Sequence, residues 1–575
     1  MGLNSKTSMI VLLYRNNIIS SVTDGLSQTP FCFPVGAQCL ILSAPRAEAC
    51  GPRRSFIVST HIVWFKRDLR VTDHAPLADA AARGKVLPLY VIEPELWAQP
   101  DVSSRHWQFI RASLLDLSHS LARRGAPLVI RRGEIIEVLS QLKRELGEVT
   151  LWSHEETGNA WTYARDLRVA GWCREQGIAW HEAPSHGVRR RLADRDHWAS
   201  ARDAIMSAPV LSAPVQLQTV TIQSQPLPAI EDPIFGAVTP CVQAGGRQEG
   251  KRVLQTFLER RSRDYMRSIS KPGISARHCS RLSAHIAYGT LSVREIEQAT
   301  ARRVLLLKDF AEAQRDTPDE ADSRAAMAWV RQLNAFRSRL AWRCHFVQKL
   351  EQQPRLEHEC MHPAFEGMRE QDFRQDFFDA WCAGQTGYPL IDACMRSLHV
   401  NGWITFRMRA MLVSFASYHL WLDWRRTAPY MARLFTDYEP GIHYSQFQMQ
   451  SGVTGINAIR IYNPIKQSRD QDPEGRFIRR YVPEIAHLPD ELVHEPWLLG
   501  DPIKDYPAPI VDHAEAVRAA RARMAVYRQE EGFKEQAREV YRKLGSRNRP
   551  PSRRGKRRGN QKAGADAPQL ELDMG

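Results

Sequence analysis

Charged side chains inside an apolar helical segment are the first sign of chemistry in this sequence. Residues 402–424 have the apolar periodicity of a buried helix, yet Arg407 and Arg409 interrupt it. A buried arginine requires an acidic partner, because an unpaired charge is costly away from water. The loop that follows, residues 435–455, supplies Asp437. We therefore predict an internal ion pair between an arginine of this helix and Asp437.

Hydroxyl groups gather in a second segment, residues 264–292, which has the pattern of a loop that opens a helix between Ser280 and Ser283. The unsatisfied N–H groups and the dipole at such a helix start can hold a phosphate. An ordinary serine N-cap explains the same residues. The segment alone leaves both interpretations open.

A third segment, residues 336–350, places Trp342 on a helix together with Arg339 and Arg343. An aromatic side chain beside cations suits a nucleotide, which offers a base for stacking and phosphates for charge pairing. A core tryptophan beside surface arginines is the commoner arrangement. Here too both interpretations stay open.

Two kinds of sequence must position these residues. Strand and helix patterns alternate from Thr60 to about residue 205, which predicts an α/β domain with a doubly wound parallel sheet. A stretch rich in Pro, Gln and Ser then predicts a connection on the surface, and the chain after it is almost wholly helical in pattern. The predicted regions are an N-terminal extension (1–58), the α/β domain (59–207), the linker (208–250), a helical domain (251–540) and a basic disordered tail (541–575).

The charge of this 575-residue chain is concentrated near its C-terminus. There are 79 Lys and Arg against 64 Asp and Glu, a formal net charge of +15, and residues 545–562 carry eight basic side chains and no acidic one. Such a tail is either a non-specific arm for nucleic acid or a solvated end without a specific role. Residues 1–58 are interpreted as an extension without a structural role, with a transit peptide as the alternative.

Several classes of protein are excluded by what the sequence lacks. The ten cysteines form no CxxC pair and do not alternate with histidines at metal spacing, so we expect no metal, no disulfide framework and a reducing, cytoplasmic environment. The apolar run at residues 9–14 is too short to cross a bilayer, so no membrane segment is expected. The sequence has no P-loop, no HExxH, no GxSxG, and no GxGxxG at the first turn from strand to helix.

Four blocks of sequence resemble, in order and spacing, the photolyase/cryptochrome family of FAD-dependent blue-light proteins. The blocks are residues 64–77 (WFKRDLRVTDHAPL), 279–295 (CSRLSAHIAYGTLSVRE), 384–409 followed by LDWR, and 437–455 followed by IYNPIKQ, EGRFIRRYVPE and HEPW. The resemblance covers roughly residues 60–500. It implies an N-terminal antenna domain and a helical domain that holds a U-shaped FAD beside a cavity open to DNA.

The resemblance assigns the FAD contacts residue by residue. Arg409 and Asp437 match the ion pair beside the flavin ring, and Cys279 stands where a hydroxyl residue is usual, which removes one phosphate contact. His443 stands at the position that faces flavin N5, where an imidazole shifts the stable redox and protonation state. The expected cofactor-binding residues are Tyr265, Cys279, Ser280, Arg281, Leu282, Ser283, Arg343, Arg409, Asp437, Glu439 and His443.

The lesion pocket departs from the family pattern. Trp342 keeps the stacking tryptophan, but the acid, asparagine, methionine and second tryptophan of repair enzymes are replaced here, in that order, by Arg339, Phe406, Ala410 and Met449. Loss of the carboxylate and the amide weakens lesion discrimination unless other groups compensate. The expected DNA and lesion contacts are Arg339, Trp342, Phe406, Arg407, Ala410, Met449 and Gln467.

The electron-transfer chain is also incomplete. Trp424 matches the middle tryptophan of the family's triad, but Phe447 and Gln371 occupy the proximal and distal places. Phenylalanine is too hard to oxidise to relay a hole, so we predict that this route fails; Tyr418, Trp421 and Tyr444 offer detours. Residues 153–159 do not settle whether a second antenna chromophore, of folate or flavin type, is bound.

Three functions remain. The favoured one is a photolyase that repairs pyrimidine dimers in DNA by light-driven electron transfer. The complete FAD set and the basic charge favour it. The alternatives are a cryptochrome-like photoreceptor that has lost efficient repair, and a light-insensitive flavoprotein or DNA-binding relic. We expect DNA as the partner, a monomer, and association with the nucleoid if the source is bacterial.

Overall fold

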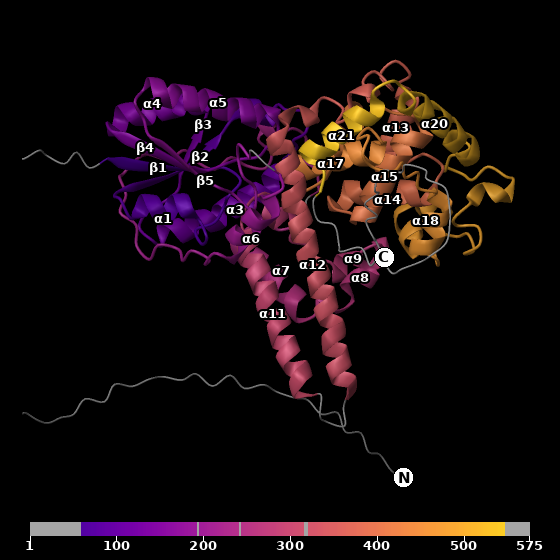
Figure 1. Cartoon of the computed structure of the whole chain (residues 1–575), viewed down its shortest axis with the longest axis horizontal. Helices are drawn as coiled ribbons and strands as arrows, with labels where there is room; N and C mark the ends of the chain where they lie inside the picture. The colour runs from indigo at the N-terminus through magenta and orange to yellow at the C-terminus, as the bar shows by residue number, and fades with distance from the viewer. Residues whose placement is uncertain (1–58, 193–194, 241–242, 315–319, 547–575) are drawn as a thin grey trace, which may run out of the picture. The chain divides into compact units, whose positions relative to one another are not determined.

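The computed structural model describes residues 59–192, 195–240, 243–314 and 320–546. The predictions for residues 1–58 and for nearly all of the basic tail lie outside these residues. Within them, an α/β layer precedes a large set of helices (Figure 1), as the sequence predicts.

The N-terminal part is built on a five-stranded parallel sheet of order β3-β2-β1-β4-β5. Its strands are β1 Thr60–Phe65, β2 Val86–Ile92, β3 Val129–Arg132, β4 Val149–His154 and β5 Trp180–Ala183. The helices between and after them are α1 Ala75–Ala81, α2 Pro94–Trp97, α3 Ser104–Ala122, α4 Ile135–Leu146, α5 Ala160–Glu175 and α6 Trp198–Ser207. Figure 1 shows α4 and α5 on one face of the sheet and α1 and α3 on the other. The strand order reverses between β1 and β4, where ligands of such sheets usually bind.

The predicted linker is held against the α/β domain. Residues 208–232 run beside the sheet, where the Val86 N–H donates to Gln218 O at 2.7 Å and the Gln225 N–H donates to Ile130 O at 3.0 Å. The helical part begins at Arg247, four residues before the predicted boundary, because Asp116 of α3 accepts the Arg247 N–H at 2.8 Å. That cap comes from a distant part of the chain, so the local sequence does not reveal it.

Helices and short helical turns are the remaining regular elements of the described chain, and loops connect them. The α-helices are α7 Arg247–Glu259, α8 Tyr265–Ser268, α9 Pro272–His278, α10 Ser283–Ala287, α11 Val293–Ala313, α12 Glu320–Gln352, α13 Gln375–Ala383, α14 Pro389–Asn401, α15 Phe406–Ser414, α16 Trp424–Leu434, α17 Pro440–Ser451, α18 Pro464–Gln471, α19 Arg476–Tyr481, α20 His513–Arg528 and α21 Phe533–Leu544. The short turns are η1 Pro233–Phe235, η2 Arg261–Asp264, η3 Pro354–Glu357, η4 Pro363–Phe365, the π-helical η5 Phe415–His419, η6 Pro483–Ile485 and η7 Pro496–Leu499.

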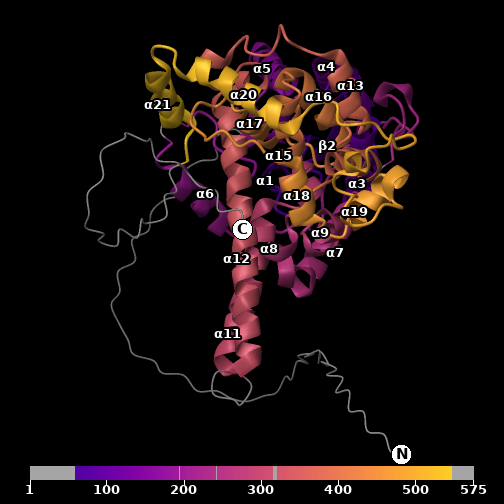
Figure 2. The ribbon, with the colours of Figure 1, turned by 90° about the vertical axis from the view of Figure 1, so that its right-hand side faces the viewer.

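The 33-residue α12 extends for about 50 Å at 1.5 Å per residue. Figures 1 and 2 show α11 lying along its N-terminal half. Its C-terminal half reaches the other helices and carries Trp342 and Arg343. No helix in the described ranges is both long and apolar enough to cross a membrane.

Two glycines fix the segments that build the central cavity. Gly402 ends α14 in the left-handed conformation (φ 65°), and a Cβ there would clash with Thr436 Oγ1. Within residues 402–424, where the sequence has helical periodicity, α15 begins at Phe406, since Thr405 caps it by accepting the Met408 N–H at 3.3 Å. At Gly441 a Cβ would come within 2.6 Å of the Val347 Cα, so only glycine lets α17 pack this closely on α12.

Candidate functional site

One cavity of about 320 Å³ gathers most of the predicted site residues. Its wall comes from α8, the loop at 279–283, α12, α15, the loop at 435–439 and α17. The predicted residues that line it are Tyr265, Cys279, Ser280, Arg281, Ser283, Arg339, Trp342, Arg343, Phe406, Arg407, Arg409, Ala410, Asp437, Glu439, His443 and Phe447.

The predicted ion pair on the apolar helix is present. Arg409 Nη2 lies 2.9 Å from Asp437 Oδ2 and 3.0 Å from Oδ1, and Arg409 Nε donates to Ile404 O at 3.1 Å. Burial by itself would raise the pKa of Asp437, but the Arg409 charge, a hydrogen bond with Ser283 and the Arg281 charge hold that pKa below its usual value. Asp437 is therefore a fixed anion in the cavity wall.

A second ion pair joins α12 to α17. Arg343 Nη2 lies 2.6 Å from Glu439 Oε2, and both side chains are buried. The other terminal nitrogen, Arg343 Nη1, is buried without a hydrogen-bond partner among the described residues. An unpaired guanidinium nitrogen at a cavity wall is costly unless a ligand accepts its hydrogen bond.

The loop at 279–283 presents a cation and hydroxyls to the cavity. Arg281 adopts a left-handed conformation (φ 59°) and its guanidinium stacks 4.1 Å from the Trp403 ring. Burial lowers the pKa of Arg281 to about 10, so it stays charged at neutral pH.

The loop supports two of its expectations less well. The helix it opens, α10, has only five residues, so its dipole is weak support for a phosphate. Leu282 is fully buried in the hydrophobic core and does not line the cavity, so its assignment to the cofactor stays a prediction.

His443 is held as a neutral imidazole with a defined tautomer. Its Nε2 lies 2.9 Å from Ala428 O, and a carbonyl can only accept, so Nε2 carries the hydrogen. Burial lowers the pKa of His443 to about 3. The remaining ring nitrogen, Nδ1, therefore keeps a lone pair and can accept a hydrogen bond.

The predicted lesion-contact residues divide into two groups. Arg339, Trp342, Phe406 and Arg407 are half-buried in the cavity wall, and Ala410 is buried beside them. Met449 and Gln467 do not line the cavity. Met449 sits on α17 and Gln467 on α18. Their assignment to DNA and lesion contact stays a prediction.

The three positions of the electron-transfer chain lie in different environments. Phe447 lines the cavity, Trp424 is buried in the core behind it, and Gln371 is exposed. Sequence reasoning missed several residues of the cavity wall because they look like ordinary core residues. These are mainly Trp403, Ile404, Phe435, Tyr438, Gln446 and Gln450.

The unpaired polar atoms of the wall indicate what the cavity binds. Both side-chain amide atoms of Gln446 are buried without a partner in the described parts of the chain, as is Arg343 Nη1. Together with the apolar side chains around them, these groups fit a large planar ligand that also has hydrogen-bonding edges and an anionic part.

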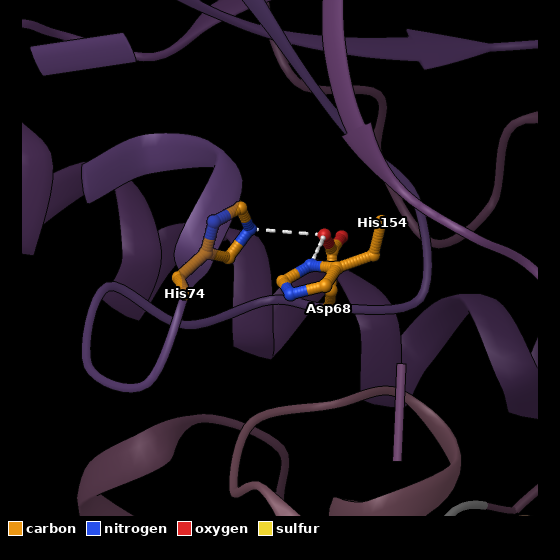
Figure 3. A group of neighbouring side chains, drawn as sticks. All are labelled: Asp68, His74 and His154. Carbon is orange, nitrogen blue, oxygen red and sulfur yellow. Dashed lines mark hydrogen bonds and ion pairs between the residues drawn. The ribbon is translucent and has the colours of Figure 1, made fainter. Parts of the chain in front are cut away.

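A smaller buried cluster lies where the strand order reverses. Figure 3 shows two imidazoles directed at the carboxylate of Asp68, with His74 Nε2 at 2.9 Å and His154 Nδ1 at 2.7 Å from Oδ2. Three such groups can in principle bind a metal ion. However, His74 Nδ1 accepts the Leu77 N–H at 3.1 Å, so Nε2 must carry the hydrogen that Asp68 accepts. A metal-bound histidine normally donates from its second nitrogen, so the hydrogen bonds favour a structural cluster.

The crevice beside this cluster is narrow. Its cavity of about 30 Å³ is lined by Lys66, His154 and Glu156 among others. Lys66 lies 3.1 Å from Asp166, and Arg165 pairs with Glu93 at 2.8 Å. A crevice of this volume does not hold a chromophore of folate or flavin type in this conformation.

The fold and the cavity together define a cofactor-binding protein with an α/β domain and a helical domain. Two family models match the same two parts: "DNA photolyase" at residues 61–190 and "FAD binding domain of DNA photolyase" at residues 336–526. The chain belongs to the photolyase/cryptochrome family.

Photo-lyases and cryptochromes are both found among the relatives, at similar sequence identity. The deoxyribodipyrimidine photo-lyase of Escherichia coli (strain K12) is 28% identical over 486 residues, which covers 80% of this chain and 97% of that protein. Cryptochrome-2 of Arabidopsis thaliana is 28% identical over 464 residues, covering 76% and 72%.

Solved structures agree with this assignment. A bacterial class III photolyase from Agrobacterium tumefaciens superposes with a TM-score of 0.67 at 25% identity, covering 84% of this chain and all of that one. An archaeal photolyase from Sulfolobus tokodaii, solved with two FAD molecules, gives a TM-score of 0.65 at 25% identity, covering 81% and 100%. The FAD-binding domain model spans α15, α17 and most of the cavity wall, and the unpaired groups described above fit FAD.

Proposed function

We propose that this protein is a deoxyribodipyrimidine photo-lyase, which uses blue light and FAD to split pyrimidine dimers in DNA. The observation that carries the proposal is a single cavity whose wall contains two Arg–carboxylate pairs and a half-buried Trp342 flanked by arginines. Reduced FAD, when bound and excited, supplies the electron that splits the dimer and takes it back afterwards.

The residues of this chain bind and orient. Arg409 and Asp437 hold a fixed pair of charges against the flavin, and Arg343 offers Nη1 to a ligand oxygen. Trp342 stacks on the flipped-out bases. Its aromatic face replaces the base stacking that is lost when these bases leave the duplex. Arg339, which stands at the position of the base-reading carboxylate in repair enzymes of the family, contacts the DNA phosphates together with Arg407.

An illumination assay tests the proposal. Chemically reduced, FAD-containing protein is mixed with a dimer-containing oligonucleotide under blue light and in darkness, and restored oligonucleotide is measured. We expect light-dependent restoration by the unaltered protein. Trp342→Ala should bind the damaged strand about fivefold to about 150-fold more weakly, because stacking is worth about 1–3 kcal/mol. Trp161→Ala, on α5 of the α/β domain, should leave binding unchanged. Lack of light-dependent restoration by the unaltered protein would reject the proposal.

A cryptochrome-like photoreceptor is the second candidate. Two observations favour it: Phe447 lines the cavity where an oxidisable tryptophan is expected, and the base-reading carboxylate and amide are absent from the positions of Arg339 and Phe406. Light-dependent change of the flavin spectrum without any dimer splitting in the same assay would favour this candidate.

We also propose that the basic tail strengthens binding to DNA of any sequence and that the protein acts as a monomer, on the nucleoid if the source is bacterial. Residues 545–562 carry eight basic side chains. Each phosphate neutralised releases counterions, so the slope of log affinity against log salt should become shallower when residues 545–575 are deleted. Affinity is measured on undamaged duplex DNA between low and physiological salt. An unchanged slope would contradict the role of the tail.

A further inference from the structure

A tyrosine of the cavity wall is hydrogen-bonded to a buried carboxylate of the α/β domain. Tyr438 lies in the loop between α16 and α17, lines the cavity and is almost fully buried. Its hydroxyl donates to Asp101 Oδ2 at 2.6 Å. Asp101 precedes α3 and is also buried. The phenol thus faces the ligand space on one side and a proton acceptor on the other.

The surroundings hold this pair in place. Both oxygens of Asp101 accept from Asn159 Nδ2, at 3.2 and 3.0 Å. The Tyr438 backbone carbonyl accepts from Arg67 Nη2 at 2.6 Å, and its ring packs against His443 with 5.2 Å between centroids. The ring of His443 is in turn 4.5 Å from that of Phe447. Tyr438 is therefore fixed beside His443, which is expected to face flavin N5. Through His443 it lies near Phe447, which occupies the proximal electron-transfer position.

Oxidation of a phenol is coupled to loss of its proton. Burial and the Asp101 charge raise the pKa of Tyr438 well above its usual value, so it is a neutral phenol at physiological pH. When an electron leaves such a phenol, the O–H becomes strongly acidic, and a hydrogen-bonded carboxylate can take the proton at once. Phe447 has neither a proton to give nor an easily removed electron.

We propose that Tyr438 is the electron donor to light-excited oxidised flavin in the cavity, with Asp101 as its proton acceptor. Tyr438 loses one electron to the flavin, and its O–H bond breaks as the proton moves to Asp101 Oδ2. The products are a neutral tyrosyl radical, a protonated Asp101 and a flavin with one added electron. Return of the electron and the proton restores the starting state. The inference rests on FAD binding in this cavity, but not on dimer repair.

Tyr418, which the sequence offers as an electron-transfer detour, is a competing donor to be tested. It is also fully buried, but its hydroxyl has no hydrogen-bond partner among the described residues. A phenol without a proton acceptor should not act as a donor, so we expect the radical to persist in Tyr418→Phe. Tyr444, which also borders this cluster, is replaced separately to test it as a competing donor.

The experiment uses oxidised, FAD-containing full-length protein and its variants, each checked for bound flavin by absorbance. Electron paramagnetic resonance after blue illumination records the protein radical, and transient absorption records its formation in H2O and D2O. We expect a tyrosyl radical that is lost in Tyr438→Phe, retained in Tyr418→Phe and Tyr444→Phe, and formed more slowly in D2O. Asp101→Asn should lose most of the signal while it keeps bound flavin.

Other outcomes overturn the inference. An unchanged radical in Tyr438→Phe, a tryptophan radical in the unaltered protein, or equal rates in H2O and D2O would each contradict it. Repair of dimers by chemically reduced Tyr438→Phe is measured in parallel, because that reaction does not need the donor. If the unaltered protein does not repair dimers, the photo-lyase proposal is rejected, but the test of Tyr438 as an electron donor still stands.

Discussion

At the scale of single residues, the two arginine–carboxylate pairs of the cavity differ in how visible they are in the sequence. Arg409 interrupts an apolar helix, so a partner can be sought, and Asp437 is found in the next loop. Arg343 lies among other polar residues of α12, and its pairing with Glu439 depends on the close approach of α17 at Gly441. Because this helix contact depends on a single glycine, which has no side chain, it leaves no periodic pattern in the sequence.

Replacement of Asp437 tests whether the buried pair stabilises the fold as well as the site. We expect Asp437→Asn to lower the free energy of unfolding by about 3 kcal/mol, because Arg409 loses its counter-ion in a largely buried setting. The variant should also lose FAD. Urea unfolding monitored by circular dichroism measures the first effect and flavin absorbance the second.

The pH dependence of this stabilisation has a definite sign. The pKa of Asp437 is lower in the folded protein than in the unfolded chain, where it is near 3.9. The stabilisation is therefore fully present above about pH 4 and is lost as pH falls below that value, toward the lowered folded pKa. Asp376→Asn is the control, since its pair with Arg374 is fully exposed and should matter little. Equal effects of the two substitutions would contradict the argument.

At the scale of elements, periodicity and capping residues account for what could be predicted. The alternation of strands and helices predicted the parallel sheet, which the structure confirms. The apolar periodicity of residues 402–424 does not reveal where α15 begins, because Thr405 caps it through a side chain whose partner is not evident from periodicity. The start of α7 was missed because its cap, Asp116, belongs to another domain.

The cavity itself follows from the sequence only in part. Charged and aromatic residues in unusual settings pointed to α12, α15 and the loop at 435–439. Gln446 and Tyr438 escaped notice because each looks like an ordinary residue of a buried helix or loop. Their significance depends on atoms left without a partner, or on a carboxylate more than 300 residues away in the chain, as for Asp101 and Tyr438. Such information exists only in the folded protein.

At the scale of the whole molecule, the loop after β1 joins the α/β domain to the helical domain. Arg67 donates to Ala287 O and Tyr438 O, and Arg70 donates to Gly289 O at 3.1 Å. Between these arginines, Asp68 accepts hydrogen bonds from the Lys66 N–H, His74 and His154. The carboxylate thus orders the loop that also supports the backbone of Tyr438.

This arrangement predicts that Asp68 stabilises the joint without any metal. In Asp68→Asn one hydrogen-bond acceptor becomes a donor that faces an imidazole N–H, so we expect the free energy of unfolding to fall by about 3 kcal/mol. Chelation with EDTA should leave the Tm of the unaltered protein unchanged. A fall in Tm on chelation, restored by added Zn²⁺, would show that the cluster is a metal centre instead.

The histidines of the cluster add a dependence on pH. Burial lowers the pKa of His154 to about 3 and also lowers that of His74, whereas both take up protons near pH 6.5 in the unfolded chain. Because the unfolded state then binds more protons, the stability of the protein should decline as pH falls from about 6.5 toward 3. His154→Gln, which keeps a neutral polar side chain that cannot be protonated, should flatten this decline, while the substitution of His358, an exposed histidine, should not. A decline of the same slope in His154→Gln would place the pH sensitivity elsewhere in the molecule.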